Sequence, residues 1–422
     1  MNRKAASVIA ASAALTLGLT GCSSGGGGTD GPEEDPASVE GTLRVLTPSF
    51  PTNNEGQAAF EQVVEEFQKT YPNMEVEPDF ATYQNLNEKM STSIASGGGY
   101  DVLVSGVGWT APFADRGVFM DLEEFGITPE EPGEVSEELL QAGVFEEAVY
   151  AYPLVVDARA IAYRKSAFIE AGLDPDDPPE TFEELKAAAE ALTQRDAAGN
   201  ITRPGFDFNT TPGNYRQAFV IFLSSTGVDL YDGDEPNFNS EEGIEALQFM
   251  ADMIGNVQEF GQQNAAQTAL VLSDEAPMGF VQSSIDCEIV IECDDLAFFL
   301  PDNGRPAEMI GGDLSSVGAN TDYPDAAWAF IQAMMSVENQ DRIALMNNKI
   351  PASNEVPQDA ASLSNPLAEF TFENLDNGIY EGGPANWLEV RSIFGPTIDE
   401  VLLGQTSAED ALERIESEAL SG

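Results

Sequence analysis

The chain has 422 residues, of which 73 are acidic and 18 are Lys or Arg, so its formal charge at pH 7 is −55. So few basic residues argue against nucleic-acid binding, because contacts with phosphates require Lys and Arg. Histidine is absent, which excludes Ser-His-Asp and Cys-His catalytic sites and every histidine metal site. The length favours two domains, since it exceeds what one hydrophobic core usually holds.

The N-terminus has the features of a secretion signal. Residues 2–4 form a short basic segment. Residues 5–20 are uncharged and mostly apolar, and this stretch is too short to span a bilayer comfortably. The stretch ends in Leu19-Thr20-Gly21-Cys22, which resembles the lipobox of bacterial lipoproteins. That resemblance implies cleavage before Cys22 and a diacylglyceryl group on its thiol, which would anchor the protein to a membrane. An ordinary signal peptide with a chance cysteine is the alternative.

The segment after Cys22 predicts a flexible tether. Residues 23–31 are Ser, Gly, Thr and Asp, and the acidic, proline-containing residues up to 40 extend the spacer, so we expect folded structure from Gly41. Removing residues 1–21 takes away two basic residues and no acidic one, so the formal charge changes from −55 to −57. Acidic residues spread along a Lys-poor chain are typical of proteins from salt-loving organisms, where salt screens the repulsion. A merely acidic secreted protein is the alternative.

The first folded residues alternate between strand and helix patterns. Short apolar runs predict strands, and apolar residues at helical spacing predict the helices between them. The expected order is a strand at 42–47, a helix at 55–70, a strand at 74–80, a helix at 86–95 and a strand at 100–104. This order is typical of an α/β domain with a parallel sheet.

A second mixed α/β unit follows. Thr181 with Glu184 three residues later forms a capping-box pattern that begins one of its helices, and Ser240 can cap another. The expected strands are 161–163, 278–281 and 296–300, and the expected helices are 165–171, one beginning within 179–185, 217–226, 240–254, 326–335, 339–347, 393–403 and 408–420.

Once Cys22 is lipidated, two cysteines remain, Cys287 and Cys293. In an oxidising compartment we expect this pair to form a local disulfide. A metal pair is the alternative, but the sequence offers no third soft ligand.

Four stretches in order resemble the extracellular solute-binding proteins of ABC transporters, in particular the maltose-binding type. They are residues 95–104 with 114–122; residues 152–157, 163–165, 171–173 and 179–185; residues 238–247; and residues 311–317, 326–330 and 349–352. The resemblance runs from about residue 42 to the end of the chain. One departure is Arg164, where the family usually has Asn.

The resemblance implies a two-lobed α/β fold of the periplasmic-binding-protein type (type II), with hinge crossovers and a ligand cleft between the lobes. The chain would cross near residues 155–157, 300–302 and 350–356. Lobe one would then be 41–155 plus 303–350, and lobe two 158–299 plus 357–422. The implied function is non-enzymatic binding of a sugar or oligosaccharide by a monomer outside the cell and its delivery to a membrane permease, with no cofactor and no metal.

A sugar presents hydroxyls around an apolar ring face, so its site needs aromatic platforms with carboxylates, amides and Arg at the edges. Trp109 and Trp387 stand at positions where the family places ligand contacts, with Arg391 one helical turn after Trp387. Asp157 lies at the first predicted crossing. Packing is the alternative for both tryptophans, and Trp328 is expected in the core.

Further candidates for ligand contact come from several segments. They are Phe50, Asn53 and Asn54 after the first strand, where Asn54 could instead cap a helix, together with Tyr215, Gln217, Phe280, Gln282, Gly312 and Asp313. Other polar ligands, such as a polyol or an amino-acid derivative, stay open. So do a lipid-anchored glycoside hydrolase and an adhesin, although neither fits the four-part resemblance.

Overall fold

The computed structural model describes residues 35–421 apart from 97–98, 209–213 and 284. The predicted signal peptide, Cys22 and most of the tether therefore lie outside the described residues. Pro36–Gly422 forms one compact unit. No helix among the residues described has the length and apolar character needed to cross a membrane.

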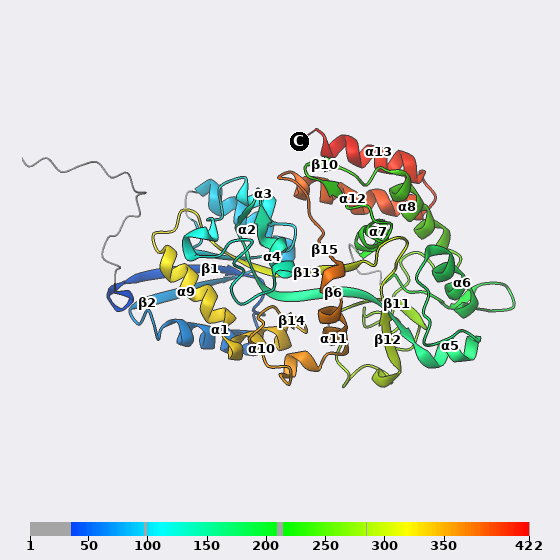
Figure 1. Ribbon diagram of the computed structural model, residues 1–422, viewed down its shortest axis with the longest axis horizontal. Helices are drawn as coiled ribbons and strands as arrows, with labels where there is room; N and C mark the ends of the chain where they lie inside the picture. The colour runs from blue at the N-terminus through cyan, green and yellow to red at the C-terminus, as the bar shows by residue number, and fades with distance from the viewer. Residues whose placement is uncertain (1–34, 97–98, 209–213, 284, 422) are drawn as a thin grey trace, which may run out of the picture. The chain divides into compact units, whose positions relative to one another are not determined.

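One mixed sheet runs through this unit (Figure 1). Its strand order is β11-β6-β13-β3-β1-β2, with β12 and β14 also paired to β6 and β15 to β13. β2 and β3 run parallel to β1, whereas β13 is antiparallel to both β3 and β6. The strands are β1 (Gly41–Thr47), β2 (Met74–Phe80), β3 (Val102–Gly106), β6 (Tyr152–Arg164), β11 (Met278–Gln282), β12 (Leu296–Phe299), β13 (Glu308–Val317), β14 (Ile350–Pro351) and β15 (Gly378–Ile379).

A first core forms where helices pack on β1, β3 and the first half of β6. Phe60 contacts the rings of Phe50, Phe80 and Phe330, so residues distant in sequence share one buried aromatic cluster. The helices around this half are α1 (Asn54–Phe67), α2 (Tyr83–Ser96), α3 (Thr110–Ala114), α4 (Glu137–Leu140), α9 (Pro324–Met335) and α10 (Val337–Met346).

A second core forms on β11 and the second half of β6. Phe222 lies near its centre and contacts Phe182, Phe208, Phe249 and Phe280. The helices in this half are α5 (Lys165–Ala171), α6 (Phe182–Leu192), α7 (Asn214–Ser225), α8 (Glu241–Met253), α12 (Trp387–Leu402) and α13 (Ala408–Ala419). α11 (Pro366–Glu373) contributes Ala368 to the first core.

Short elements complete the fold. Three small antiparallel pairs are β4 (Val144–Phe145) with β5 (Ala148–Val149), β7 (Gln194–Arg195) with β8 (Ile201–Arg203), and β9 (Tyr231–Asp232) with β10 (Glu235–Pro236). Single 3-10 turns are η1 (Pro36–Ser38), η2 (Leu122–Phe125), η3 (Gln141–Gly143), η4 (Cys293–Asp295), η5 (Ala361–Ser364) and η6 (Leu375–Asn377).

Two strands pass from one core to the other. Along β6, Val156 lies in the first core and Ile161 in the second. Along β13, Met309 lies in the second core and Ile310 in the first. Since β6 and β13 pair with each other, the two cores share a two-stranded connection, as the two-lobed α/β type predicted from the sequence requires.

Most predicted elements are confirmed within a few residues, and so is the capping box of Thr181 and Glu184. The predicted cap of α1 is wrong by one residue: Asn53, not Asn54, is the N-cap, and its side chain accepts a hydrogen bond of 2.8 Å from the backbone nitrogen of Gly56. The sequence did not predict the full length of β6, and it predicted neither β13 nor α11.

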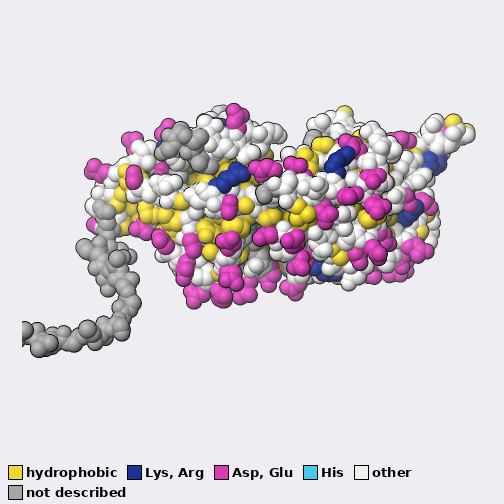
Figure 2. Space-filling model, turned by 90° about the horizontal axis from the view of Figure 1, so that it is seen from above, with side chains coloured by type: hydrophobic (Ala, Val, Ile, Leu, Met, Phe, Trp, Pro, Cys, Tyr) yellow, Lys and Arg dark blue, Asp and Glu magenta, His cyan; other side chains and the backbone are white. Residues whose placement is uncertain are grey.

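The structure contains the predicted disulfide between Cys287 and Cys293, whose Cα atoms are 5.4 Å apart. Figure 2 shows acidic side chains scattered over one face of the molecule among hydrophobic and other side chains, with fewer basic side chains between them. The excess negative charge of the sequence therefore appears as a distributed surface charge and not as one acidic segment.

Candidate functional site

A cavity of about 260 Å³ lies where the two cores meet, beside β6 and β13. We call it the central cavity. Aromatic, amide, carboxylate and cationic side chains from both halves of the chain line it, together with backbone of β13. The lining residues are Tyr83, Gly106, Val107, Trp109, Asp157, Arg159, Gln217, Met309, Ile310, Gly311, Gly312, Lys349, Glu381 and Arg391.

The loop between β3 and α3 brings Trp109 to the cavity. Gly108 has a φ of +84°, and a Cβ on it would lie 2.4 Å from the carbonyl oxygen of Glu381. Glycine is therefore required here, because any side chain would strain the backbone and push the loop away from Glu381. The Trp109 ring is braced from behind by Phe113, with parallel rings whose centroids are 6.0 Å apart.

The opposite wall comes from the paired strands β6 and β13. Gly312 has a φ of +135°, and a Cβ there would lie 2.0 Å from the carbonyl oxygen of Val155. This close approach lets the backbone of β13 line the cavity. Asp157 and Arg159 lie two residues apart on β6, so their side chains share one face of the strand. Their closest charged atoms, Oδ2 and Nη1, are 3.4 Å apart.

Glu381 is a buried carboxylate with several cationic and amide partners. Arg216 donates to both carboxylate oxygens, at 2.9 Å from Nη2 to Oε2, and Gln217 donates to Oε2 at 3.3 Å. The Nε of Arg391 lies 3.8 Å from Oε1. Burial acts to raise the pKa of Glu381, but the charges of Arg216 and Arg391 outweigh it and hold that pKa below its usual value.

Asp313 lies behind the cavity wall and holds two of the lining residues. Its side chain is 1% exposed. It accepts hydrogen bonds from Lys349 Nζ at 2.7 Å, from Ser49 Oγ at 2.7 Å, and from the hydroxyl of Tyr83. Lys349 and Tyr83 are thereby fixed at the cavity surface, although they come from distant parts of the chain.

The arrangement can bind a small polar molecule with an apolar face. Trp109 supplies a flat ring, and amide, carboxylate and cationic groups surround it. A model of bacterial extracellular solute-binding proteins matches residues 51–341. The chain belongs to this family.

Relatives of this solute-binding protein agree with that assignment. A putative binding protein of Brucella abortus is 29% identical over 130 residues, a match that covers 31% of each chain. The maltotriose-binding protein of Pyrococcus abyssi is 23% identical over 331 residues, which cover 73% of this chain and 66% of the relative. The chain therefore matches only about a third of the first relative's length and just under two thirds of the second's.

Solved structures share the fold of this solute-binding protein at low identity. The GacH receptor of Streptomyces glaucescens matches with a TM-score of 0.70 and 20% identity, covering 91% of this chain and 98% of that one. A cyclic α-maltosyl-1,6-maltose binding protein from Arthrobacter globiformis matches with a TM-score of 0.71 and 22% identity, with coverage of 91% and 98%. A protein from Agrobacterium radiobacter, solved with ribitol, matches with a TM-score of 0.70 and 20% identity, covering 92% and 100%.

Five of the residues predicted to bind ligand line the central cavity. They are Trp109, Asp157, Gln217, Gly312 and Arg391. Asp313 reaches the cavity only through Lys349 and Tyr83, because its own oxygens are occupied by their hydrogen bonds and by Ser49.

The predicted loop after β1 does not reach the lining of this cavity. Phe50 is buried in the first core and packs edge-on against Phe60. Asn53 uses its side-chain oxygen as the cap of α1, and Asn54 is exposed as the first residue of that helix.

Trp387 lies behind the cavity and not on its surface. The side chain is 0% exposed and packs edge-on against Tyr231 and tilted against Phe394. Its indole nitrogen would lie 3.0 Å from a Cβ on Gly108, so it backs the loop that carries Trp109. In this structure Trp387 is therefore a packing residue, which was the alternative to ligand contact. The core position expected for Trp328 is only partly reached, since its half-buried ring stacks on Phe125 and meets Tyr152 edge-on.

The remaining candidates do not line the central cavity. Tyr215 stacks on Phe260, and its hydroxyl accepts a hydrogen bond of 3.0 Å from the backbone nitrogen of Gly261. Phe280 and Gln282 line a much smaller cavity of about 10 Å³. That space is about enough for one water molecule and not for a sugar.

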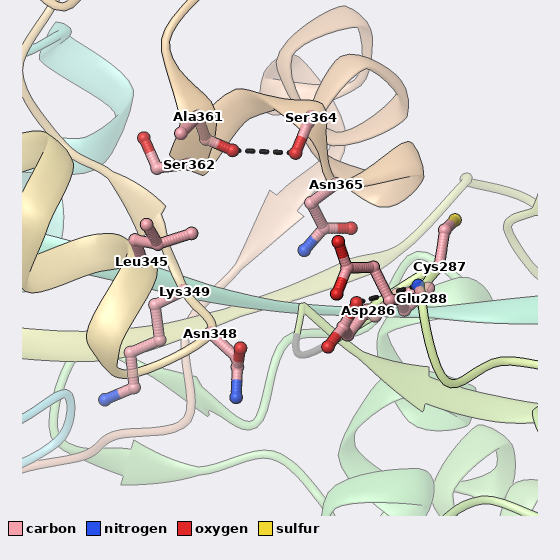
Figure 3. Close-up of a pocket in the computed structure, with 11 residues that line it drawn as sticks. Asp286, Cys287, Glu288, Leu345, Asn348, Lys349, Ala361, Ser362, Ser364 and Asn365 are labelled. Atoms are coloured by element: carbon pink, nitrogen blue, oxygen red, sulfur yellow. Dashed lines mark hydrogen bonds between the residues drawn. The ribbon is translucent and has the colours of Figure 1, made fainter.

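A second, larger cavity of about 440 Å³ adjoins Lys349 (Figure 3). We call it the side cavity. Leu345, Asn348 and Lys349 line one side of it, and Asp286 and Glu288 lie across from them, next to the disulfide. It lacks an aromatic platform among its lining residues, so the central cavity is the stronger candidate for a sugar.

Four side chains that line the central cavity were not predicted from the sequence: Tyr83, Arg159, Lys349 and Glu381. Arg159 could have been found, because residues two apart on a strand share a face and Asp157 was already a candidate. The other three carry no local signal, since the contacts that bring them to the cavity are made over long stretches of chain.

Proposed function

We propose that this protein captures a small sugar or polyol in the central cavity and delivers it to the permease of an ABC importer. The observation that carries the proposal is the position of Trp109 at a cavity between two cores, among hydrogen-bonding groups from both halves of the chain. The names of relatives support a sugar or polyol: one is called a maltotriose-binding protein, and similar folds were solved with acarbose or ribitol.

The two cores would act as lobes that close on the ligand. We place lobe one at residues 41–155 plus 303–350 and lobe two at 158–299 plus 357–422, with hinges near 155–157, 300–302 and 350–356. The change of core between Met309 and Ile310 suggests that the second boundary belongs a few residues later, on β13. Closure about β6 and β13 would then change the space between Trp109 and Arg391.

The protein would work as a monomer on the outer side of the cytoplasmic membrane, held by a lipid on Cys22. The support is the order of basic start, apolar stretch and lipobox in the sequence. Two acyl chains on one cysteine would give stable anchoring without a membrane-spanning helix.

Binding without catalysis fits the state of Glu381, one of the two carboxylates that line the cavity. A glycoside hydrolase needs one carboxylic acid that stays protonated to donate to the leaving group. Glu381 has a lowered pKa and is held by Arg216, so it is a poor proton donor.

A thermal-shift panel of sugars and polyols, run beside an assay for released reducing sugar, tests the proposal. A ligand at about 100 times its Kd should stabilise the native protein by about 2.7 kcal/mol, with no release of sugar. Trp109→Ala should weaken that ligand's binding by roughly fivefold to thirtyfold, because an aromatic contact contributes about 1–2 kcal/mol. Turnover, or no stabilisation by any member of the panel, would refute it.

A further inference from the structure

Two arginines face the central cavity with hydrogen-bonding capacity that the protein itself does not use. The Arg159 side chain is 12% exposed, its Nε is buried without a hydrogen-bond partner, and its charged contact is Asp157 at 3.4 Å. Arg391 is 31% exposed and lies 3.8 Å from Glu381. Among the described residues, no hydrogen bond to either guanidinium group is found. Buried donors of this kind are costly unless a ligand or water satisfies them.

Other buried arginines of the chain make hydrogen bonds within the protein, although Nη1 of Arg164 has no hydrogen-bond partner among the described residues. Arg216 makes two hydrogen bonds to Glu381. Arg164 donates to the carbonyl oxygens of Val271 at 3.0 Å and Ile291 at 2.8 Å. In a chain with 73 acidic residues, a carboxylate partner is easily supplied. Arg159 and Arg391 differ from these arginines in that no nitrogen of either guanidinium group donates a hydrogen bond to the described part of the protein.

The charge around the cavity is opposite in sign to the charge of the whole protein. Arg159, Lys349 and Arg391 line it against Asp157 and Glu381, an excess of one positive charge. Including Arg216 and Asp313 behind the wall adds one charge of each sign and leaves the excess unchanged. One negative charge on a ligand would balance it.

The two arginines also act on each other. Burial lowers the pKa of Arg391 despite the attraction of Glu381, and the charges of Arg216 and Arg159 lower it further. A negative group placed between Arg159 and Arg391 would relieve this repulsion. Guanidinium groups bind carboxylates and phosphates through paired hydrogen bonds.

From these contacts we propose that the ligand of the central cavity is a sugar acid, with its carboxylate held by Arg159 and Arg391 and its ring against Trp109. A carboxylate carries the single charge that the cavity balances, whereas a phosphate ester carries about −1.5 to −2 at pH 7. The cavity volume of about 260 Å³ lies just below the usual range of about 300–1,000 Å³ for small-molecule sites, which favours a single ring. The inference rests on the proposed function and names its substrate class.

Isothermal titration calorimetry on the secreted protein tests it with matched pairs of ligands. The probes are D-glucuronate, D-galacturonate and D-mannuronate, each beside its neutral parent sugar, with glucose 6-phosphate as the phosphate arm. We expect at least one acid to bind tenfold or more tightly than its parent and than the phosphate. Neutral sugars that bind as tightly as their acids would overturn the inference and leave the proposed function standing, and tighter binding of the phosphate would overturn the carboxylate assignment. If no probe binds, the inference falls, and the thermal-shift panel of sugars and polyols decides the proposed function separately.

Variants of the two arginines test whether they cause the preference for the sugar acid over its neutral parent. Arg159→Gln and Arg391→Gln should each weaken binding of the preferred acid by about tenfold to a hundredfold, with little change for its parent, because each removes charged hydrogen bonds to the carboxylate. Arg116→Gln is the matched control, since it removes an exposed arginine paired with Glu389 outside the cavity, and it should keep the preference. A preference that survives both cavity variants would overturn the assignment. The wild-type comparison stands even if one variant fails to fold.

Discussion

Glu308 should make the stability of this protein depend on pH near neutrality. The residue begins β13, where the chain passes between the two cores, and its side chain is fully buried. Thr371 of α11 donates to its Oε1 at 2.8 Å, and its Oε2 has no hydrogen-bond partner among the described residues. Burial raises the pKa of Glu308 to about 7, and the hydrogen bond from Thr371 only partly offsets this.

The size and sign of the effect follow from linkage. The pKa rises from 4.5 in the unfolded chain to about 7 in the folded one, and each unit corresponds to about 1.4 kcal/mol, so the effect is on the order of 3 kcal/mol. Between these two pH values the folded protein keeps the proton and the unfolded chain has lost it. This residue's contribution to stability is therefore full below about pH 4.5 and declines as the pH rises to about 7.

Urea unfolding of the wild type and of Glu308→Gln at pH 5 and pH 8 measures this contribution. The amide stays neutral and can still accept the hydrogen bond of Thr371, so the variant should be more stable than the wild type by roughly 3 kcal/mol at pH 8 and by much less at pH 5. Exposed Glu413 provides a control, since Glu413→Gln should change stability little at either pH. Equal differences at the two pH values, or a variant less stable at pH 8, would refute the reasoning.

Four further predictions concern the core, the anchor, the surface and the disulfide. Trp387→Ala should lower the free energy of unfolding by about 3–5 kcal/mol, whereas Trp109→Ala should mainly weaken ligand binding; chemical denaturation and calorimetry separate the two, and a stable Trp387 variant would contradict the packing described. Cys22→Ala should release the protein into the medium, and its retention in the membrane fraction would exclude the lipid anchor. The melting temperature should rise between about 0.1 M and 1 M NaCl as salt screens the acidic surface; a flat or falling value would count against salt adaptation. Cys287 and Cys293 should show no free thiol in the denatured, unreduced protein, so two titratable thiols would disprove the bridge.

Much of the fold is predictable because local sequence patterns determine many of its helices and strands. The capping box at Thr181 and the apolar spacing in α1 and α8 depend only on neighbouring residues. β13 is harder to predict as a strand because two glycines interrupt it, and its shape depends on the close approach of Gly312 to Val155. That approach is a tertiary contact that no local pattern announces.

The candidate site is only partly predictable for the same reason. Trp109 follows β3, whose position the sequence predicted to within two residues, whereas Asp157 lies in a part of β6 that was expected only as a crossing implied by the resemblance. Lys349 and Tyr83 reach the cavity through Asp313, which is 36 and 230 residues away from them in sequence. Trp387 begins α12, and its burial depends on ring contacts with Phe394 and with Tyr231, which is distant in sequence. The sequence therefore indicates Trp387 as an aromatic residue near the site, but it does not show whether the ring lies on the cavity surface or behind it.

The central claim is that the cavity beside Trp109 holds the transported solute. A crystal structure of the protein with the tightest ligand from the sugar and sugar-acid panels tests it most directly. We expect electron density for the ligand between Trp109, Arg159 and Gly312. The ligand ring should lie on the indole, with a polar group within hydrogen-bonding distance of Arg391. Density in the side cavity next to the disulfide, with the central cavity filled only by water, would contradict it.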